Sequence, residues 1–454
     1  MELGGKKILI VGAARSGIAA AKFLWARGAV VALTDQKPIE KWAPEALALK
    51  GSGIGLLPGE PPSWLLDRLH LVVVSPGVPA NIIPIRYAER AGAEVIGEVE
   101  LASRFLQGRI IAITGSNGKT TTTSLIGELL RDAGMKVQVG GNIGKALISM
   151  VETSSDDGWT VAELSSFQLE TIKTFHPTIA VVLNVTPNHM DRYETFTDYA
   201  AAKHRIFMNQ TNEDVAVLNA DDPTVSSWAS GLRAKVMNFS VKTEVDNGVF
   251  LRGRELVFRG SEGVKVLLNV DEMKLRGLHN AENAAAAFAA GIAAGASIES
   301  MNVTAKRFNP VEHRLEFVAE IDGVKFYNDS KATSVDATLK ALEAFAHEAG
   351  KVLLILGGRG KKAPYAPLES LVRTKVRKLV LIGEDAETIA AELGELAPFE
   401  RASDMKDAVT RSFNAADNGD VVLLAPACAS FDMFESFEHR GKVFKDEVRA
   451  LRVL

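Results

Sequence analysis

The sequence contains a single cysteine, Cys428, among its 454 residues. One cysteine excludes an intramolecular disulfide framework and is typical of proteins from a reducing compartment. A catalytic thiol needs a base nearby, and the residues next to Cys428 in the sequence supply none. We therefore expect Cys428 to be a small apolar core residue that follows a predicted strand at 421–424.

Long hydrophobic runs are missing as well. The most apolar predicted helix, residues 284–296, is interrupted by Gly291 and Gly295. It is shorter than the roughly 20 apolar residues that a membrane span needs. The N-terminal stretch MELGGKKILIVGAARSG has a brief apolar part that leads directly into a glycine turn, unlike a signal peptide. These observations predict a cytoplasmic protein without membrane insertion.

Neither sign of charge dominates the chain. Its 52 basic and 56 acidic residues give a formal net charge of −4. That balance provides no broad basic surface, so we expect no nucleic-acid partner. A small molecule that carries phosphate must then be bound by local features. The hydrophobic share of 47% and the charged share of 24% are typical of a globular protein.

Strands alternate with helices along a chain that is too long for one ordinary core. Apolar runs predict strands at 6–11, 30–34, 71–74, 109–114, 161–164, 179–185, 215–219, 352–356, 379–382 and 421–424. Such alternation is typical of α/β domains in which helices cover mostly parallel sheets. We predict three such domains: a Rossmann-like domain at 1–98, a central P-loop-type domain at 99–310 and a Rossmann-like domain at 311–454. Ligands of such sheets bind at the carboxyl ends of the strands.

A glycine-rich turn between a predicted strand and a predicted helix is the strongest local signal. The run AITGSNGKTT covers residues 112–121, and Lys119 begins the helix. Backbone N–H groups at such a helix start bind phosphate oxygens. Lys119 is then expected to neutralise the β- and γ-phosphates, and the Thr120 hydroxyl to bind Mg²⁺. Ile113 stands where the common P-loop has its first glycine, so the loop is a variant. A threonine-capped glycine turn without ligand is the alternative.

Three polar residues further along are candidates for a metal site. Glu163 lies at the end of an apolar run, where a carboxylate beside a phosphate loop is expected to bind Mg²⁺, although it can also face solvent. His189 follows the predicted strand at 179–185. A lone histidine is more often structural, but this position favours function. Lys203 lies in a predicted helix, and the sequence alone favours a surface lysine there.

Together these motifs resemble the Mur ligase family of bacterial cell-wall synthesis, which includes the folate polyglutamate synthases as relatives. The ATP loop of the family matches residues 114–121, its metal positions match Glu163 and His189, and its carbamylated lysine matches Lys203. Its asparagine-rich signature matches GLHNAENAA at 277–285. Its third-domain signatures match HR at 313–314 and NDSKAT at 328–333. The resemblance covers essentially the whole chain.

Within the family, the chain looks most like the members that add D-glutamate to UDP-N-acetylmuramoyl-L-alanine. This similarity is carried by SPG at 75–77, GNIG at 141–144, ELSSFQLE at 163–170 and PACASFDMF at 426–434, with Phe437 and RG at 440–441. The third segment lacks the Asp-Asn-Pro-Arg motif of diaminopimelate-adding members, and the turn GAARSG at 12–17 is poorer in glycine than in alanine-adding members. The resemblance implies an ATP-dependent amide-forming ligase with Mg²⁺ as cofactor and an acyl-phosphate intermediate. We expect a monomer that acts on these two small-molecule substrates.

The resemblance also implies the residues of each site. The catalytic residues are Lys119, His189 and Lys203. The ATP-binding residues are Gly115, Ser116, Asn117, Gly118, Lys119, Thr120, Thr121, Asn280, Asn283, Arg314 and Asp329. The metal-binding residues are Thr120, Glu163, His189 and Lys203. The UDP-substrate is expected at Ser16, Asp35, Ser75, Gly77, Asn142 and His189, and D-glutamate at Lys331, Thr333, Lys361, Ser430 and Phe431. A solvated surface position is the alternative for Lys331 and Lys361.

Two positions depart from the family pattern. Asn188 stands where many relatives have an acidic residue beside the histidine, which bears on the charge around the metal. Gln36 and Lys37 follow Asp35, which bears on the contacts to uracil and diphosphate.

Three other functions are alternatives. The first segment alone could belong to a nicotinamide-dependent oxidoreductase, but its turn lacks the middle glycine of the dinucleotide fingerprint, and that function leaves the phosphate loop unused. The other two are a Mur-type ligase for another amino acid and an ATP-driven switch that makes no bond.

Overall fold

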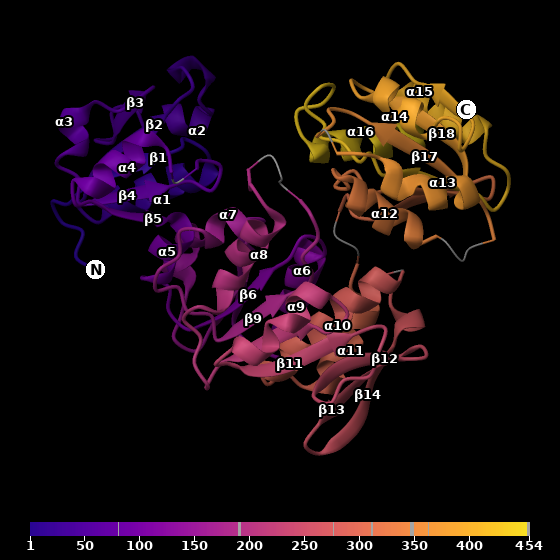
Figure 1. Ribbon diagram of the computed structural model, residues 1–454, viewed down its shortest axis with the longest axis horizontal. Helices are drawn as coiled ribbons and strands as arrows, with labels where there is room; N and C mark the ends of the chain where they lie inside the picture. Colours follow the sequence, from indigo (N-terminus) through magenta and orange to yellow (C-terminus); the bar gives the residue numbers. More distant parts are fainter. Residues whose placement is uncertain are drawn as a thin grey trace. The chain divides into compact units, whose positions relative to one another are not determined.

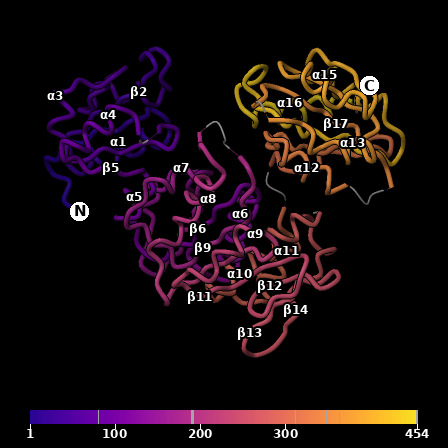
Figure 2. Tube along the Cα trace, in the orientation of Figure 1, coloured from indigo at the N-terminus to yellow at the C-terminus, as the bar shows by residue number. Residues whose placement is uncertain are grey.

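The computed structural model describes residues 1–79, 81–188, 192–275, 277–309, 312–345, 349–361 and 363–451 (Figure 1, Figure 2). Contacts divide the chain into two compact units. The first unit is Met1–Met273 with Glu282–Arg307, and the second is Lys274–Ala281 with Phe308–Leu454. His189 lies outside the described residues, so its predicted roles stay predictions.

The first unit begins with a parallel sheet in the order β3-β2-β1-β4-β5. Its strands are β1 (Lys7–Val11), β2 (Val30–Asp35), β3 (Gly55–Pro58), β4 (Leu71–Val74) and β5 (Glu94–Gly97). The helices are α1 (Arg15–Ala26), α2 (Pro44–Leu47), α3 (Ser63–Leu66), α4 (Ile83–Arg90) and α5 (Glu98–Ser103). The side chains of β4 are all buried, as expected for a parallel strand covered on both faces.

The turn between β1 and α1 requires glycine at two positions. Gly12 has a φ of +109°, which side chains rarely tolerate. A Cβ on Gly17 would lie 1.9 Å from the carbonyl oxygen of Gly12. The chain therefore bends tightly at the carboxyl end of β1, where a ligand can approach the backbone.

A second, larger sheet follows in the same unit, in the order β14-β13-β12-β11-β10-β9-β6-β8-β7. Its strands are β6 (Arg109–Thr114), β7 (Val137–Gly141), β8 (Trp159–Glu163), β9 (Ile179–Val182), β10 (Val215–Asn219), β11 (Lys235–Ser240), β12 (Gly248–Arg252), β13 (Glu255–Gly260) and β14 (Gly263–Asn269). The helices are α6 (Lys119–Asp132), α7 (Ser166–Leu169), α8 (Phe196–His204), α9 (Pro223–Ser227), α10 (Leu278–Ala293) and α11 (Ile298–Arg307), and the residues of α10 up to Ala281 belong to the second unit. Pairing is parallel from β7 to β12, and β12, β13 and β14 pair antiparallel.

The second unit contains a sheet in the order β15-β16-β20-β17-β18-β19, parallel except between β15 and β16. Its strands are β15 (Glu316–Ile321), β16 (Val324–Asn328), β17 (Val352–Gly357), β18 (Val376–Ile382), β19 (Phe399–Arg401) and β20 (Val421–Leu424). The helices are α12 (Val335–Glu343), α13 (Glu369–Lys375), α14 (Ala386–Leu393), α15 (Met405–Asn414) and α16 (Phe437–Ala450). Helices lie on both faces of this sheet (Figure 1).

The strands predicted at 71–74, 109–114, 215–219 and 421–424 are confirmed with these limits. β9 ends at Val182 rather than at residue 185, because the next residues bond to the loop after β6 instead of continuing the ladder. The antiparallel extension β12–β14 has no counterpart among the predicted strands. The predicted domain boundaries near 98 and 310 stay predictions.

Cys428 is fully buried in the core of the second unit, as predicted. Its thiol sulfur lies 3.1 Å from the hydroxyl of Tyr365, and burial raises the pKa of the thiol to about 11. Among the residues that the structure describes, no helix has the length and apolarity needed to cross a membrane.

Candidate active site

The phosphate loop, residues 115–118, joins the carboxyl end of β6 to the start of α6. β6 lies between β8 and β9, so the ends of three parallel strands meet at this loop. Gly118 has a φ of +81°, and a Cβ there would lie 2.2 Å from Oδ1 of Asn283. Gly118 therefore caps α6 with its backbone alone, which gives a phosphate oxygen access to the first turn of the helix.

Asn184, which follows β9, holds the phosphate loop in place. Its carbonyl oxygen accepts a hydrogen bond from the N–H of Ser116, and its Oδ1 accepts one from the N–H of Asn117, both at 2.8 Å. The Ser116 hydroxyl donates to the carbonyl oxygen of Thr186 at 3.0 Å and lies 3.0 Å from the hydroxyl of Tyr199. Asn184 and Tyr199 are absent from the predicted site residues. Asn184 lies inside the strand predicted at 179–185, so no local pattern indicated that it would leave the sheet and bond to the phosphate loop.

Two lysine side chains converge on the carbonyl oxygen of Gly115. Nζ of Lys119 donates to it at 2.8 Å and to the carbonyl oxygen of Ser116 at 2.9 Å. Nζ of Lys203, which lies in α8, also donates to Gly115 at 2.8 Å. Lys203 is 1% exposed, and burial together with the charge of Lys119 holds its pKa well below the ordinary value. The interpretation of Lys203 as a surface lysine is therefore wrong.

Glu163 ends β8 beside the phosphate loop and is 1% exposed, so the solvent-facing alternative is wrong. Its Oε1 accepts a hydrogen bond from Nδ2 of Asn142 at 2.9 Å. Its Oε2 is buried and has no hydrogen-bond partner among the described residues. A buried carboxylate oxygen without a partner is unfavourable, and a hard cation would satisfy it. The buried hydroxyl residue Thr120, in the first turn of α6, is of the same ligand type. These residues fit Mg²⁺.

The residues predicted for the UDP-substrate in the first sheet lie at the carboxyl ends of β1, β2 and β4. Oδ2 of Asp35 accepts a hydrogen bond from the N–H of Ala13 at 2.9 Å, which fixes the turn after β1. The buried Ser75 hydroxyl donates to the carbonyl oxygen of Gly12 at 3.0 Å. Ser16 is partly exposed in the first turn of α1, and Gly77 is exposed. These four residues therefore lie at one edge of the sheet, where a nucleotide can approach.

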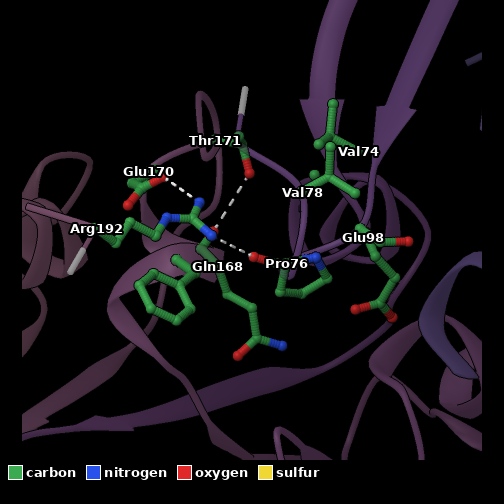
Figure 3. A pocket seen from close by; sticks show the side chains of 11 residues that line it. Val74, Pro76, Val78, Glu98, Gln168, Glu170, Thr171 and Arg192 are labelled. Atoms are coloured by element: carbon green, nitrogen blue, oxygen red, sulfur yellow. Dashed lines mark hydrogen bonds and ion pairs between the residues drawn. The ribbon is translucent and has the colours of Figure 1, made fainter. Parts of the chain in front are cut away.

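A narrow crevice lies between the loop after β4 and the loop and helix after β8 (Figure 3). It is lined by Val74, Ser75, Pro76, Val78, Gly97, Glu98, Phe167, Gln168, Glu170, Thr171 and Arg192. Figure 3 shows the Arg192 side chain lying between Glu170 and Pro76. Neither Arg192 nor Glu170 is among the predicted site residues.

Arg314 and Asp329 come together in the second unit. Burial raises the pKa of the Asp329 carboxyl to about 6, although the charges of Arg314 and Lys331 act in the opposite direction. Nε of Arg314 is buried without a hydrogen-bond partner in the described part of the chain. The Arg314 guanidinium therefore carries an unsatisfied donor beside Asp329, as expected of a group that binds a polar ligand.

The residues predicted for D-glutamate lie in three segments of the second unit. Backbone hydrogen bonds of 2.9 and 3.0 Å join Arg359 to Ala429, which brings the loop with Lys361 beside Ser430. The buried Arg440 donates to the carbonyl oxygens of Ser330 at 2.9 Å and Cys428 at 3.2 Å. Arg440 thereby joins the segments 328–333 and 426–434, a role that the family resemblance at 440–441 did not specify.

The remaining predicted residues differ in exposure. Ser430 is buried, Phe431 is 66% exposed, Thr333 and Lys331 are partly exposed, and Lys361 is exposed. Nζ of Lys331 lies 5.3 Å from the ring centroid of Phe437. Asn283 is buried near the phosphate loop, where its Oδ1 accepts from the Thr122 hydroxyl at 3.3 Å. Asn280 is buried and belongs to the second unit.

Three family models match the chain. The "Mur ligase MurD-like, N-terminal domain" matches residues 6–97, the "Mur ligase middle domain" matches 113–291, and the "Mur ligase, glutamate ligase domain" matches 313–428. Two similar curated proteins are UDP-N-acetylmuramoylalanine–D-glutamate ligases. The one from Acidobacterium capsulatum is 48% identical over 454 residues, covering 100% of this chain and 98% of the relative. The one from Solibacter usitatus is 50% identical over 452 residues, covering 99% of both.

Solved structures of the same three-domain α/β architecture are also similar. UDP-N-acetylmuramate–alanine ligase from Thermotoga maritima has a TM-score of 0.60 at 18% identity, covering 98% of this chain and 99% of that one. MurF ligase from Thermotoga maritima, solved in complex with ADP, has a TM-score of 0.63 at 16% identity, covering 99% of this chain and 96% of that one. The predicted fold class is confirmed.

Proposed function

The chain belongs to the Mur ligase family, and we propose that it adds D-glutamate to UDP-N-acetylmuramoyl-L-alanine with consumption of ATP, in peptidoglycan precursor synthesis. The observation that carries the ligase chemistry is the convergence of Lys119 and Lys203 on the phosphate loop, next to the buried carboxylate of Glu163. The choice of D-glutamate is supported by relatives of that activity that are similar over their full length.

The reaction needs ATP because a carboxylate is a poor electrophile. The carboxylate of the UDP-substrate attacks the γ-phosphorus, the bond from that phosphorus to the β,γ-bridging oxygen breaks, and ADP leaves. The amine of D-glutamate then attacks the acyl carbon of the acyl phosphate. The resulting tetrahedral intermediate expels phosphate, and the amine nitrogen loses a proton as the amide forms.

The first of these steps brings two anions together, so positive charge must offset their repulsion. Lys119, at the start of α6, would contact the β- and γ-phosphates, with backbone amides of residues 115–118 and the first turn of α6 around them. Thr121 follows in the same turn, and Asn283 lies beside the loop. These residues hold the nucleotide while the substrate carboxylate approaches.

Mg²⁺ is the metal that the residues fit. Thr120 and Glu163 would hold one ion, and His189 with a carbamylated Lys203 would hold a second. Bound Mg²⁺ would supply further positive charge at the phosphates. Carbamylation needs a neutral amine, and the depressed pKa of Lys203 supports this proposal, because it increases the neutral fraction. The carbamate then presents oxygen, which suits a hard cation.

The other substrates are assigned by domain. Ser16, Asp35, Ser75, Gly77 and Asn142 would bind the UDP-substrate, with His189 at its reactive end. Asn280, Arg314 and Asp329 would contact the nucleotide. D-glutamate would be bound by Lys331, Thr333, Lys361, Ser430 and Phe431, with the two lysines paired to its carboxylates. We propose domains at 1–98, 99–310 and 311–454, and a monomer that works in the cytoplasm, where ATP and the nucleotide-linked precursor meet.

Phosphate release from Mg²⁺-ATP tests this function. The protein is incubated with UDP-N-acetylmuramoyl-L-alanine and, in separate reactions, D-glutamate, L-glutamate, L-alanine, L-lysine or meso-diaminopimelate. Release that appears only with D-glutamate, and is lost in Lys119→Ala, is the expected result. Release with another amino acid keeps the mechanism and changes the substrate. Phosphate release that requires neither the UDP-substrate nor an amino acid favours an ATP-driven switch and overturns the ligase function.

A further inference from the structure

Arg192 joins the loop at residues 75–77, which follows β4 of the first sheet, to the second sheet. Its Nη1 donates to the carbonyl oxygen of Pro76 at 3.0 Å, and its Nη2 donates to Oε2 of Glu170 at 2.9 Å (Figure 3). Its guanidinium carbon lies 4.0 Å from the ring centroid of Phe167. The side chain is 18% exposed, so one arginine makes two hydrogen bonds and a cation–π contact in a mostly buried position.

Pro76 is the middle residue of the loop that carries Ser75 and Gly77. The Arg192 hydrogen bond is made to the backbone of that loop, so it bears directly on where the flanking residues lie. Other bonds also hold the loop, since the Ser75 hydroxyl donates to the carbonyl oxygen of Gly12 and the Ser75 N–H donates to that of Val11. Arg192 adds a contact that ties the carbonyl oxygen of Pro76 to the second sheet.

A row of packed rings leads from Arg192 to the phosphate loop. Phe167 stacks on Tyr193 with centroids 5.9 Å apart and an interplanar angle of 17°. Tyr193 meets Tyr199 edge to face at 5.3 Å. The hydroxyl of Tyr199 lies 3.0 Å from the hydroxyl of Ser116, in the phosphate loop.

Two further contacts strengthen this row at its ends. The Tyr193 hydroxyl donates to Oε1 of Glu170 at 2.5 Å, so Glu170 bonds both Arg192 and Tyr193. Nζ of Lys203 lies 4.7 Å from the ring centroid of Tyr199. A displacement of Arg192 therefore changes the packing of the same tyrosine that contacts the phosphate loop and the buried lysine.

We propose that Arg192 is a positioning residue that couples the UDP-substrate loop at 75–77 to the phosphate loop, so that each ligand strengthens the binding of the other. This inference rests on the proposed function for the identity of the two ligands. Coupling between sites is a reciprocal free energy, and contiguous packing alone does not demonstrate it. A binding measurement is therefore the deciding test.

The test is the affinity of a non-hydrolysable ATP analogue, measured by calorimetry without and with saturating UDP-N-acetylmuramoyl-L-alanine. D-glutamate is left out, so that no turnover occurs. The ratio of the two dissociation constants is the coupling factor. We expect a factor of about five or more for the unsubstituted protein, as is usual for coupled sites. We expect a factor close to one for Arg192→Ala. Arg192→Lys keeps the charge but not the paired donors, so its factor should be intermediate.

Arg233→Ala is the matched control. Arg233 lies in the same domain, is exposed, and donates a hydrogen bond to the carbonyl oxygen of Met208. Its coupling factor should equal that of the unsubstituted protein. Glu170→Gln is a second variant in case Arg192→Ala does not fold, which a melting curve reveals. It keeps the shape of the side chain but removes the charge that pairs with Arg192, so its coupling factor should also fall.

The outcomes separate the two claims. An unsubstituted protein that binds both ligands with a factor of one overturns the coupling and leaves the proposed function intact. An unchanged factor in Arg192→Ala, or in Glu170→Gln where Arg192→Ala does not fold, also overturns the coupling, whatever happens to KM. A protein that binds the ATP analogue but not the UDP-substrate overturns the proposed function and the coupling with it.

Discussion

Lys119 and Lys203 donate to the same acceptor, the carbonyl oxygen of Gly115, each at 2.8 Å. A carbonyl oxygen has two lone pairs and can accept from both. Two ammonium groups at one acceptor repel each other, which adds to burial in lowering the pKa of Lys203. Burial and the charge of Lys119 therefore act in the same direction on the pKa of Lys203, and both increase its neutral fraction.

Replacing Lys119 by methionine should decrease the proposed carbamylation of Lys203. Loss of the neighbouring charge raises the pKa of Lys203, and each unit of pKa changes the neutral fraction about tenfold. Carbon NMR with isotopically labelled bicarbonate measures the carbamate signal at fixed pH. Lys203→Met should lack the signal altogether. A signal in Lys119→Met as strong as in the unsubstituted protein would contradict this account.

Replacing Lys203 by methionine should abolish activity and yet stabilise the fold. Its pKa is lower in the folded than in the unfolded chain, so the unfolded chain binds more protons between the two values. The contribution of this group to the free energy of unfolding therefore rises with pH through that window. At neutral pH the buried amine lowers the free energy of unfolding. We expect kcat to fall at least about a hundredfold while the melting temperature at neutral pH rises. Lys235→Met, an exposed position on β11, should change neither. A lower melting temperature for Lys203→Met would show the buried amine to be stabilising.

Glu163→Gln tests the metal assignment. The amide oxygen can still accept the hydrogen bond from Asn142, so the melting temperature should change little. The loss of charge should raise the Mg²⁺ concentration for half-maximal activity by about tenfold or more. Titration of activity against Mg²⁺ measures this, with Glu128→Gln, an exposed position on α6, as the control. An unchanged Mg²⁺ dependence would exclude Glu163 as a ligand.

Asn184→Ala should weaken nucleotide binding without loss of the fold. The substitution removes the acceptor that orients the N–H of Asn117, while the backbone bond to Ser116 remains. One such hydrogen bond contributes about 1 kcal/mol, so the dissociation constant of the ATP analogue should rise roughly five- to tenfold. Calorimetry gives the value. If the affinity does not change, the side chain does not hold the loop in its binding conformation.

Asp329→Asn should change how stability depends on pH. The Asp329 carboxyl has a pKa of about 6 in the folded chain against 3.8 ordinarily, so the folded chain binds more protons between these values. The contribution of Asp329 to the free energy of unfolding is then fully present below about pH 4 and is lost as pH rises through 6. The difference in unfolding free energy between the two proteins should shift by up to about 3 kcal/mol across that window. Denaturant unfolding at several pH values measures it, and a constant difference would refute the raised pKa.

The sequence predicts the fold class and the phosphate loop because apolar runs and glycine turns determine the conformation of the segment in which they stand. The end of β9 is mispredicted because Asn184 bonds to a loop some 70 residues earlier in the chain, at Ser116, and such long-range pairing leaves no local pattern. The burial of Lys203 is hidden for a related reason. Its helix has no clear apolar face, and the amine bonds to Gly115, which is distant in sequence. Arg192 and Arg440 likewise act by joining segments that are distant in sequence.

Transfer of labelled oxygen tests the central claim most directly. UDP-N-acetylmuramoyl-L-alanine is prepared with heavy oxygen in its free carboxylate and incubated with Mg²⁺-ATP, D-glutamate and the protein. The account predicts that the released phosphate carries one heavy oxygen from the carboxylate, and that the product carries D-glutamate in a new amide bond. Released phosphate without the label would contradict the acyl-phosphate mechanism, and release that does not require D-glutamate would contradict the ligase function itself.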